Sequence, residues 1–305
     1  MSAYLTIIGL IVAGGVLARF KLLPDATPEV LNRLVIVLCL PAIILIHLPT
    51  LQPSWQLLPL VVIPWLLLAL TALAVFALSR WLGLRRDVTA TLLVLIPLGN
   101  TSFLGFPLVE ALLGPDAIRL AVVYDQFGSF LIVCTHVLFV VGWYGEGENP
   151  NWRSMGATII GFPPFLALVF ALLFGNAWMP ELLMNLTQKF ADMLLPLVTL
   201  AIGLSLQLRL VPDYRRGLLI GLIGKLLVLP GLALLLAWAL GAHGDIAVVA
   251  VLESGMPPMI TAAALLASAR LAPALGSALV AWGVVCSALT VPFWFWLATL
   301  VFQPA

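Results

Sequence analysis

The sequence predicts an all-α polytopic membrane protein whose ten transmembrane helices form a 5+5 inverted repeat with two crossed, discontinuous helices. Of the 305 residues, 63% are hydrophobic and 9% are charged, whereas soluble domains average about 45–50% apolar and about 25% charged residues. This composition excludes a water-soluble globule. The net charge of +1 leaves no basic surface for nucleic acid, so nucleic-acid partners are excluded as well.

A helix needs about 20 apolar residues to cross about 30 Å of hydrocarbon, because lipid offers the backbone no hydrogen-bond partners. The chain contains ten such stretches, which we number as spans one to ten in chain order. They cover residues 4–20, 31–48, 57–81, 88–113, 117–141, 154–174, 190–206, 216–240, 246–269 and 274–302.

Lysine and arginine residues in the short loops predict the orientation, because these residues gather on the cytoplasmic side of a membrane. Eleven of them lie in one alternate set of loops, and only Arg119 and Lys189 lie in the other set. We therefore expect a multi-pass protein with both termini on the external side. The first span has its charges after the apolar run, so we expect a retained span and not a signal peptide.

The three cysteines, Cys39, Cys134 and Cys286, all lie within apolar stretches, and the sequence has no CxxC pair and no Cys/His cluster. We expect buried thiols without a disulfide, a metal site or a cofactor. The sequence also has no nucleotide-binding loop, so ATP is not expected as an energy source.

Each half of the chain has an odd number of spans, so the second half must enter the membrane from the opposite side. Residues 1–153 are predicted to form the first repeat and residues 154–305 the second. Mid-helix prolines fall at similar offsets in matching spans. They are Pro41 and Pro196 in spans two and seven, and Pro107 and Pro257 in spans four and nine.

Glycine and proline are expected to interrupt spans four and nine, because proline removes a backbone donor and glycine adds conformational freedom. Span four contains Gly99-Asn100 and Gly105-Phe106-Pro107, and span nine contains Gly255-Met256-Pro257-Pro258. Polar residues crowd both positions. Ordinary proline kinks are the alternative, whereas unwound backbone at membrane depth must be buried in protein or line a cavity, as in a binding site.

Four polar residues are predicted near the middle of the bilayer, from a helical rise of about 1.5 Å per residue. They are Asn100, Asp125, Lys225 and Glu253. A charge at this depth costs at least a few kcal/mol, so such residues normally face the protein interior and have partners. A static ion pair of Lys225 with Glu253 or with Asp125 is the alternative to a functional role, and the sequence leaves both pairings open. His136 is expected to be a hydrogen-bonded packing residue.

The interruption of span four resembles the Asn-Thr-Gly-Phe-Leu-Gly-x-Pro break of the auxin efflux carrier family. It reads Asn100-Thr101-Ser102-Phe103-Leu104-Gly105-Phe106-Pro107-Leu108, with Ser102 where the family often has glycine. Gly255-Met256-Pro257 and the ten-span layout extend the resemblance over essentially the whole chain. The short connector at residues 142–153 is similar to that of compact bacterial members, which implies a location in the bacterial inner membrane.

The resemblance implies a scaffold of spans one, two, six and seven, and a transport domain of spans three to five and eight to ten that moves like an elevator. Prokaryotic members of the family are described as small organic-acid permeases. The sequence therefore predicts a secondary active transporter of a small organic anion, which would be an auxin-like, malate-like or malonate-like mono- or dicarboxylate.

The residues Glu253-Ser254-Gly255-Met256 are similar to the Glu-Thr-Gly-Met-Gln-Asn of the related bile acid/sodium symporters, in which the acid helps to hold sodium. Pro257-Pro258 replaces the Gln-Asn pair here. Coupling to protons is therefore the expectation. A sodium-coupled symporter of the bile-acid type, with sodium near Glu253, is the alternative.

An enzyme is not expected, because Tyr124-Asp125 resembles only one half of an intramembrane aspartyl protease site, and GxSxG and HExxH are missing. The expected partners are a carboxylate solute, a proton or sodium ion and the lipid bilayer, and a homodimer is left open. The expected solute-binding residues are Asn100, Thr101, Ser102, Gly105, Pro107, Gly255, Met256, Pro257 and Pro258, and the expected coupling residues are Glu253, Asp125 and Lys225.

Overall fold

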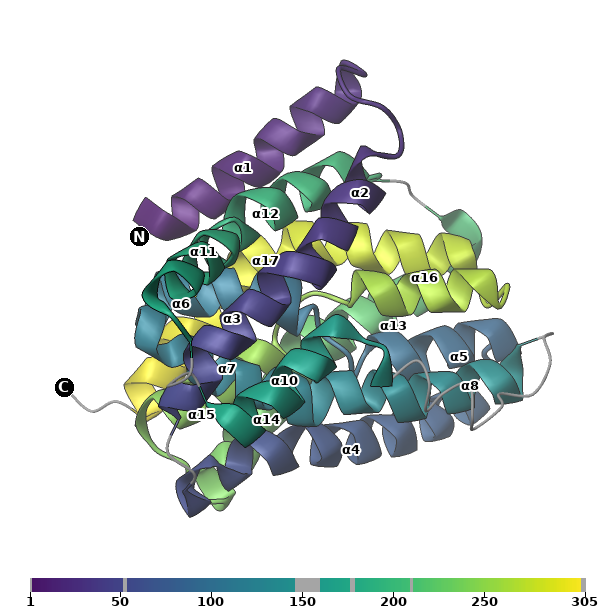
Figure 1. The fold of residues 1–305 in the computed structure, drawn as a ribbon. Helices are drawn as coiled ribbons and strands as arrows, with labels where there is room; N and C mark the ends of the chain where they lie inside the picture. Colours follow the sequence, from purple (N-terminus) through teal and green to yellow (C-terminus); the bar gives the residue numbers. More distant parts are fainter. Residues whose placement is uncertain (1, 52–53, 146–159, 176–178, 209–210, 303–305) are drawn as a thin grey trace. The chain divides into compact units, whose positions relative to one another are not determined.

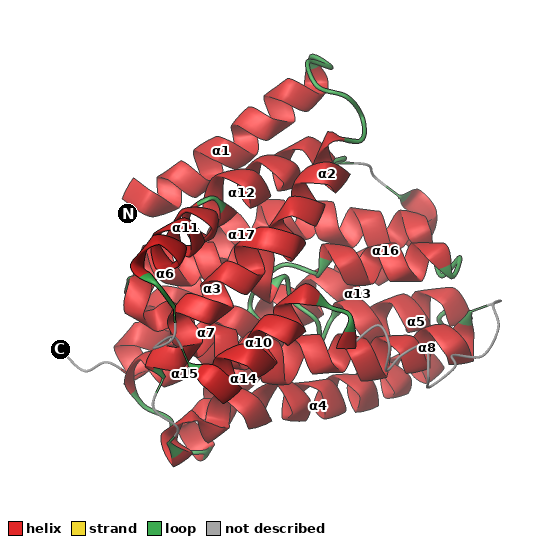
Figure 2. Cartoon of the chain, viewed as in Figure 1, coloured by secondary structure: helices red, strands yellow, loops and turns green. Residues whose placement is uncertain are grey.

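The computed structural model describes residues 2–51, 54–145, 160–175, 179–208 and 211–302. These residues form helices and connecting loops, with no β-strand among them (Figure 2). Six helical stretches are long and apolar enough to cross a membrane: Thr27–Thr50, Trp55–Leu82, Pro115–Tyr144, Glu181–Ser205, Pro212–Ala239 and Pro273–Phe302. Three shorter apolar helices are Tyr4–Arg19, Thr101–Leu113 and Pro163–Phe174. The predicted all-α membrane class is confirmed, and the count of ten spans stays a prediction.

Two helices begin at other residues than the sequence predicts. The helical stretch expected at 190–206 begins at Glu181, because the helix Glu181–Asp192 is too polar to be detected by hydropathy. Its first turn contains Glu181, whose negative charge stabilises a helix N-terminus. The helix expected at 154–174 is described as α10 (Pro163–Phe174), with proline at its first position, where a missing N–H costs nothing. Residues 154–159 lie outside the described residues.

The chain divides into two compact units, each assembled from three separate stretches of sequence. Unit 1 consists of Met1–Ser54, Ser102–Gln126 and Gly156–Leu206. Unit 2 consists of Trp55–Thr101, Phe127–Met155 and Gln207–Ala305.

In unit 1, the first helix packs along α12 (Figure 1). Gly14 and Gly203 permit the two helices to approach closely, because a Cβ on Gly203 would lie only 2.9 Å from the Gly14 Cα. The helices of unit 1 are α1 (Ser2–Arg19), α2 (Thr27–Leu34), α3 (Leu40–His47), α6 (Phe106–Leu113), α7 (Ile118–Tyr124), α10 (Pro163–Phe174), α11 (Glu181–Asp192) and α12 (Leu194–Ser205).

In unit 2, two helices form the centre of the packing. All residues from 88 to 95 in α5 and from 247 to 254 in α15 are buried. Helix α5 packs against α4, α8, α13, α16 and α17, and α15 packs against α4, α14 and α17. The helices of unit 2 are α4 (Leu58–Leu82), α5 (Arg86–Leu95), α8 (Leu138–Tyr144), α13 (Arg215–Ile223), α14 (Leu229–Ala239), α15 (Gly244–Ser254), α16 (Ile260–Ser268) and α17 (Pro273–Phe302).

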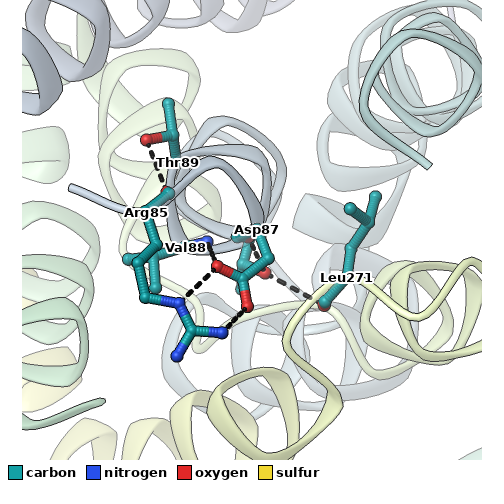
Figure 3. A network of polar contacts seen from close by, with 6 residues as sticks. Arg85, Asp87, Val88, Thr89 and Leu271 are labelled. Carbon is teal, nitrogen blue, oxygen red and sulfur yellow. Dashed lines mark hydrogen bonds and ion pairs between the residues drawn. The ribbon is translucent and has the colours of Figure 1, made fainter. Parts of the chain in front are cut away.

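A polar network around Asp87 fixes the start of α5 (Figure 3). The Arg85 guanidinium donates to both Asp87 carboxylate oxygens, at 3.1 and 2.7 Å, and the Val88 N–H donates to one of them at 2.9 Å. The Thr91 hydroxyl donates to the Leu271 carbonyl at 3.2 Å. The contacts of Asp87 stabilise the first turn of α5, and the Thr91 contact links α5 to the loop that precedes α17.

Several helices are locally wound as π-helix, in which the hydrogen bonds are shifted by one residue and part of the backbone is left unpaired. Such segments are frequent at functional sites. Within the described residues they are η1 (Val35–Cys39), η4 (Thr101–Gly105), η6 (Asp125–Phe130), η7 (Val133–Val137) and η9 (Gly224–Val228).

Candidate functional site

Two buried helices of unit 2 end in the interior of the unit. Helix α5 ends at Leu95 and η4 begins at Thr101, while α15 ends at Ser254 and α16 begins at Ile260. We name the intervening segments break 1 (residues 96–100) and break 2 (residues 255–259). Both breaks lie within the glycine- and proline-containing sequences from which an interruption is expected.

The two breaks hydrogen-bond to each other through their backbones. The Asn100 N–H donates to the Pro257 carbonyl at 2.8 Å, and the Met259 N–H donates to the Leu98 carbonyl at 3.2 Å. An antiparallel bridge pairs Gly99 with Pro258. Backbone groups that a continuous helix would satisfy are therefore satisfied across the breaks, as burial requires.

Break 2 leaves a carbonyl oxygen without a helical partner. In a continuous helix the Ser254 carbonyl would accept a hydrogen bond from the N–H of residue 258, but proline has no N–H. The Lys225 ammonium, which comes from η9, donates to this carbonyl at 2.9 Å. Lys225 has an exposed fraction of 0%, so its charge is held entirely inside unit 2.

A glycine at position 99 provides the space for this ammonium. A Cβ on Gly99 would lie 3.1 Å from the Lys225 Nζ and 3.1 Å from the Glu253 carbonyl oxygen. Any side chain at this position would therefore push against the ammonium and the backbone of α15. Break 1 and break 2 meet the lysine at the same point.

Lys225 also interacts electrostatically with Glu253, whose exposed fraction is 0%. The sequence leaves the acidic partner of Lys225 open between Glu253 and Asp125, and this electrostatic interaction favours Glu253. A nearby opposite charge lowers the cost of a buried charge, which by itself amounts to several kcal/mol.

Break 1 shows the same relationship with a different side chain. Pro97 removes the N–H that would bind the Leu93 carbonyl, and His136 Nε2, from η7, lies 3.0 Å from that oxygen. A carbonyl only accepts, so Nε2 carries the hydrogen. His136 is thus a hydrogen-bonded packing residue, in agreement with its interpretation from the sequence.

The side chain of Asn100 is the polar group in break 1 that lacks a partner. Asn100 has an exposed fraction of 3%, and its Nδ2 has no hydrogen-bond partner within the described residues. A buried donor without an acceptor costs about 1–3 kcal/mol. The amide is therefore suited to a ligand that brings an acceptor, and a carboxylate is a strong one.

A second buried polar cluster lies in unit 1. The Ser102 hydroxyl donates to Asp125 Oδ1 at 2.6 Å, and Gln126 Nε2 donates to Asp125 Oδ2 at 2.8 Å. All three residues are buried. Since the amide nitrogen of Gln126 faces a carboxylate, its Oε1 points elsewhere, and that oxygen has no hydrogen-bond partner within the described residues.

Gln126 is a buried polar residue that is not predicted from the sequence. The signal was its position directly after Asp125, but a glutamine beside a charged residue is equally typical of a solvated helix face. The remaining predicted residues are distributed over both units: Thr101, Gly255, Met256, Pro257 and Pro258 belong to unit 2, and Gly105 and Pro107 belong to unit 1.

Pro107 lines a cavity of ≈ 520 Å³ in unit 1. The polar or charged side chains that line this cavity are His47, Glu110, Gln188 and Asp192. Glu110 and Asp192 interact electrostatically, and Gln188 Nε2 donates to Asp192 Oδ1 at 2.8 Å. Neither His47 nor Glu110 is predicted from the sequence as a site residue.

Comparison with known proteins gives a consistent result. The sequence model of a family described as membrane transport protein matches residues 1–157 and 152–295. An uncharacterized transporter of Methanothermobacter thermautotrophicus is 26% identical over 299 residues, which cover 95% of each chain. An uncharacterized transporter of Methanocaldococcus jannaschii is 24% identical over 270 residues, which cover 84% of this chain and 85% of that protein.

Proposed function

The chain belongs to the membrane transport protein family, of the auxin efflux carrier type, and from this premise we propose that it is a secondary active transporter of a small organic anion. The observation that carries the anion assignment is the buried Asn100 amide, whose Nδ2 has no partner within the described residues. A donor of this kind is kept at a cost, and a carboxylate oxygen of the solute offsets that cost.

The surroundings of Asn100 in unit 2 support a negatively charged ligand. The Lys225 ammonium lies beside Gly99, the residue directly before Asn100. Helix α16 begins directly after break 2, and the N-terminal end of a helix carries a partial positive charge. Glu253 carries a negative charge in the same region while it is ionised, so protonation of Glu253 would favour the anion.

Protons are the proposed coupling ions, and Glu253 and Asp125 are the groups that would bind them. Protonation of either acid would remove a negative charge from the carrier and so favour the binding of an anion, which links the two fluxes. A sodium-coupled symporter of the bile-acid type is the second candidate, favoured by the Glu253-Ser254-Gly255-Met256 sequence.

We further propose elevator-type alternating access by an inverted repeat of residues 1–153 and 154–305, in which breaks 1 and 2 belong to crossed helices. The division into units supports a separate scaffold, because unit 1 contains the expected spans one, two, six and seven. The residues Ser102–Gln126 depart from the family's division, since they belong to unit 1 although they lie in spans four and five. We place both termini on the external side of a bacterial inner membrane, from the distribution of arginine and lysine.

The test is solute uptake into proteoliposomes by purified protein and by Asn100→Ala. We expect uptake of a labelled mono- or dicarboxylate from a panel of malate, malonate, pyruvate and indole acids, and a decrease of at least about tenfold in the variant, since a hydrogen bond to a charged group contributes about 1.5–3 kcal/mol. Asn185→Ala, an exposed asparagine of α11, is the matched control and should transport normally. Full uptake by a folded Asn100→Ala protein would contradict the proposal.

A further inference from the structure

We propose that the Lys225 ammonium occupies a monovalent-cation site formed by break 2, so that the chain supplies covalently a cation that would otherwise be taken from solution. This inference deepens the proposed function, on which it rests, because it concerns the ion requirement of the same site. It predicts a carrier that does not need sodium, and it identifies one side chain as the reason.

First, break 2 leaves two backbone carbonyls without their helical donors. Pro257 and Pro258 lack the N–H groups that would bind the carbonyls of Glu253 and Ser254 in a continuous helix. The Glu253 carbonyl accepts from the Met256 N–H at 3.3 Å. The Ser254 carbonyl accepts from Lys225 at 2.9 Å. Carbonyls freed in this way, at the negative end of a helix dipole, are typical cation ligands in transporters with broken helices.

The second step is the position of the ammonium. Lys225 Nζ and the Glu253 carbonyl oxygen both lie 3.1 Å from the Cβ position of Gly99. The Glu253 carboxylate interacts with the same ammonium electrostatically. The nitrogen therefore donates to one carbonyl oxygen of break 2 and interacts electrostatically with one acid, and it borders a space that a side chain on residue 99 would fill.

The third step is the match between the two cations. A lysine ammonium is a compact point charge with three donors on a flexible stem, so it needs oxygen atoms around it, as a sodium ion does. If the stem is shortened, the Ser254 carbonyl loses its donor and Glu253 loses a nearby positive charge. The unfavourable buried charge should then attract a small cation from solution.

The experiment measures the thermal stability of the purified full-length chain in detergent, without any transported solute. Lys225→Ala is compared with the unmodified protein in sodium chloride, methylammonium chloride and choline chloride at equal ionic strength. We expect sodium or methylammonium to raise the midpoint of the variant by about 3 °C or more relative to choline, and to leave the unmodified protein unchanged. Lys225→Met keeps most of the aliphatic stem, is less prone to misfold and is measured in parallel.

Two further variants give the controls. Lys189→Ala removes an exposed lysine of α11 and should show no salt-specific response. Lys225→Ala combined with Glu253→Gln removes both buried charges and should lose the response to sodium. Equal midpoints for both single Lys225 variants in all three salts would overturn the inference, and so would a sodium response of the unmodified protein as large as that of Lys225→Ala.

This readout separates the inference from the proposed function. Cation binding is observed without a solute, so a salt-specific response of Lys225→Ala stands even if no carboxylate is transported. Conversely, transport lost in Asn100→Ala together with no response to salt would retain the carrier and remove the cation site.

Discussion

Break 1 and break 2 interrupt two equally buried helices of unit 2, but they place different chemistry there. Break 1 contributes a side-chain donor, the Nδ2 of Asn100, which has no partner within the described residues. Break 2 contributes a backbone acceptor, the Ser254 carbonyl, which is held by Lys225. One break is therefore suited to an anionic solute, and the other is suited to a cation.

The two breaks share one principle. In each, a proline leaves the carbonyl four residues earlier without its helical donor, and a side chain from a π-helical segment donates instead: His136 for Leu93 and Lys225 for Ser254. A third carbonyl, that of Leu226, lies four residues before Pro230, and Trp294 Nε1 of α17 donates to it at 2.8 Å. The position of the proline determines which backbone carbonyl lacks its helical donor. The side chain that donates to this carbonyl determines whether the position is neutral or charged.

The largest effect is expected from Lys225→Ala. The substitution removes the donor to the Ser254 carbonyl and the positive charge that interacts with buried Glu253, and removal of one partner of a buried charge pair costs about 3–5 kcal/mol. Chemical unfolding in sodium-free detergent buffer measures the loss. A change within about 0.5 kcal/mol would show that Glu253 is compensated by another group.

The next largest effect on the free energy of unfolding is expected at Gly99 of break 1, and a much smaller effect is expected at Gly255 of break 2. In Gly99→Ala the new methyl group would lie 3.1 Å from the Lys225 Nζ and 3.2 Å from the Met256 Cβ, and such overpacking costs about 1–3 kcal/mol. In Gly255→Ala the contacts begin at 3.4 Å, so the change should stay within about 0.5 kcal/mol. Thermal unfolding and solute uptake check both variants. Equal effects at the two positions would remove the special role of Gly99.

A smaller effect is expected when the neutral donor at break 1 is removed. His136→Phe keeps an aromatic ring but leaves the Leu93 carbonyl without its donor, at a cost of about 1–2 kcal/mol. Chemical unfolding measures this loss against that of Lys225→Ala. A loss as large as that of Lys225→Ala would contradict the distinction between a neutral and a charged position.

The smallest effect is expected from a double-mutant cycle with Pro97→Ala. Alanine restores the N–H that a helix would direct at the Leu93 carbonyl, so His136→Phe should cost about 1 kcal/mol less in the Pro97→Ala background. The coupling energy from the four unfolding curves measures the difference. A coupling of zero would mean that proline and histidine act independently.

The membrane class and the positions of both breaks could be predicted from the sequence, because hydropathy and the glycine and proline residues act locally. Burial of Asn100, Lys225 and Glu253 also followed from their depth in apolar stretches. The acceptor of Lys225 could not be predicted, because Ser254 belongs to another helix. Its carbonyl lacks a helical donor only because residue 258 is proline. The start of α11 at Glu181 was missed because that helix is polar.

The hydrogen bond from the Asn100 N–H to the Pro257 carbonyl has a consequence for biosynthesis. When the ribosome has delivered residue 100 to the insertion machinery, the acceptor of its N–H has not yet been translated. The backbone amide of Asn100 therefore has no acceptor from break 2 until the C-terminal half of the chain has been synthesised and inserted. A chain truncated after the first half should consequently be retained by the translocon or removed by membrane proteases.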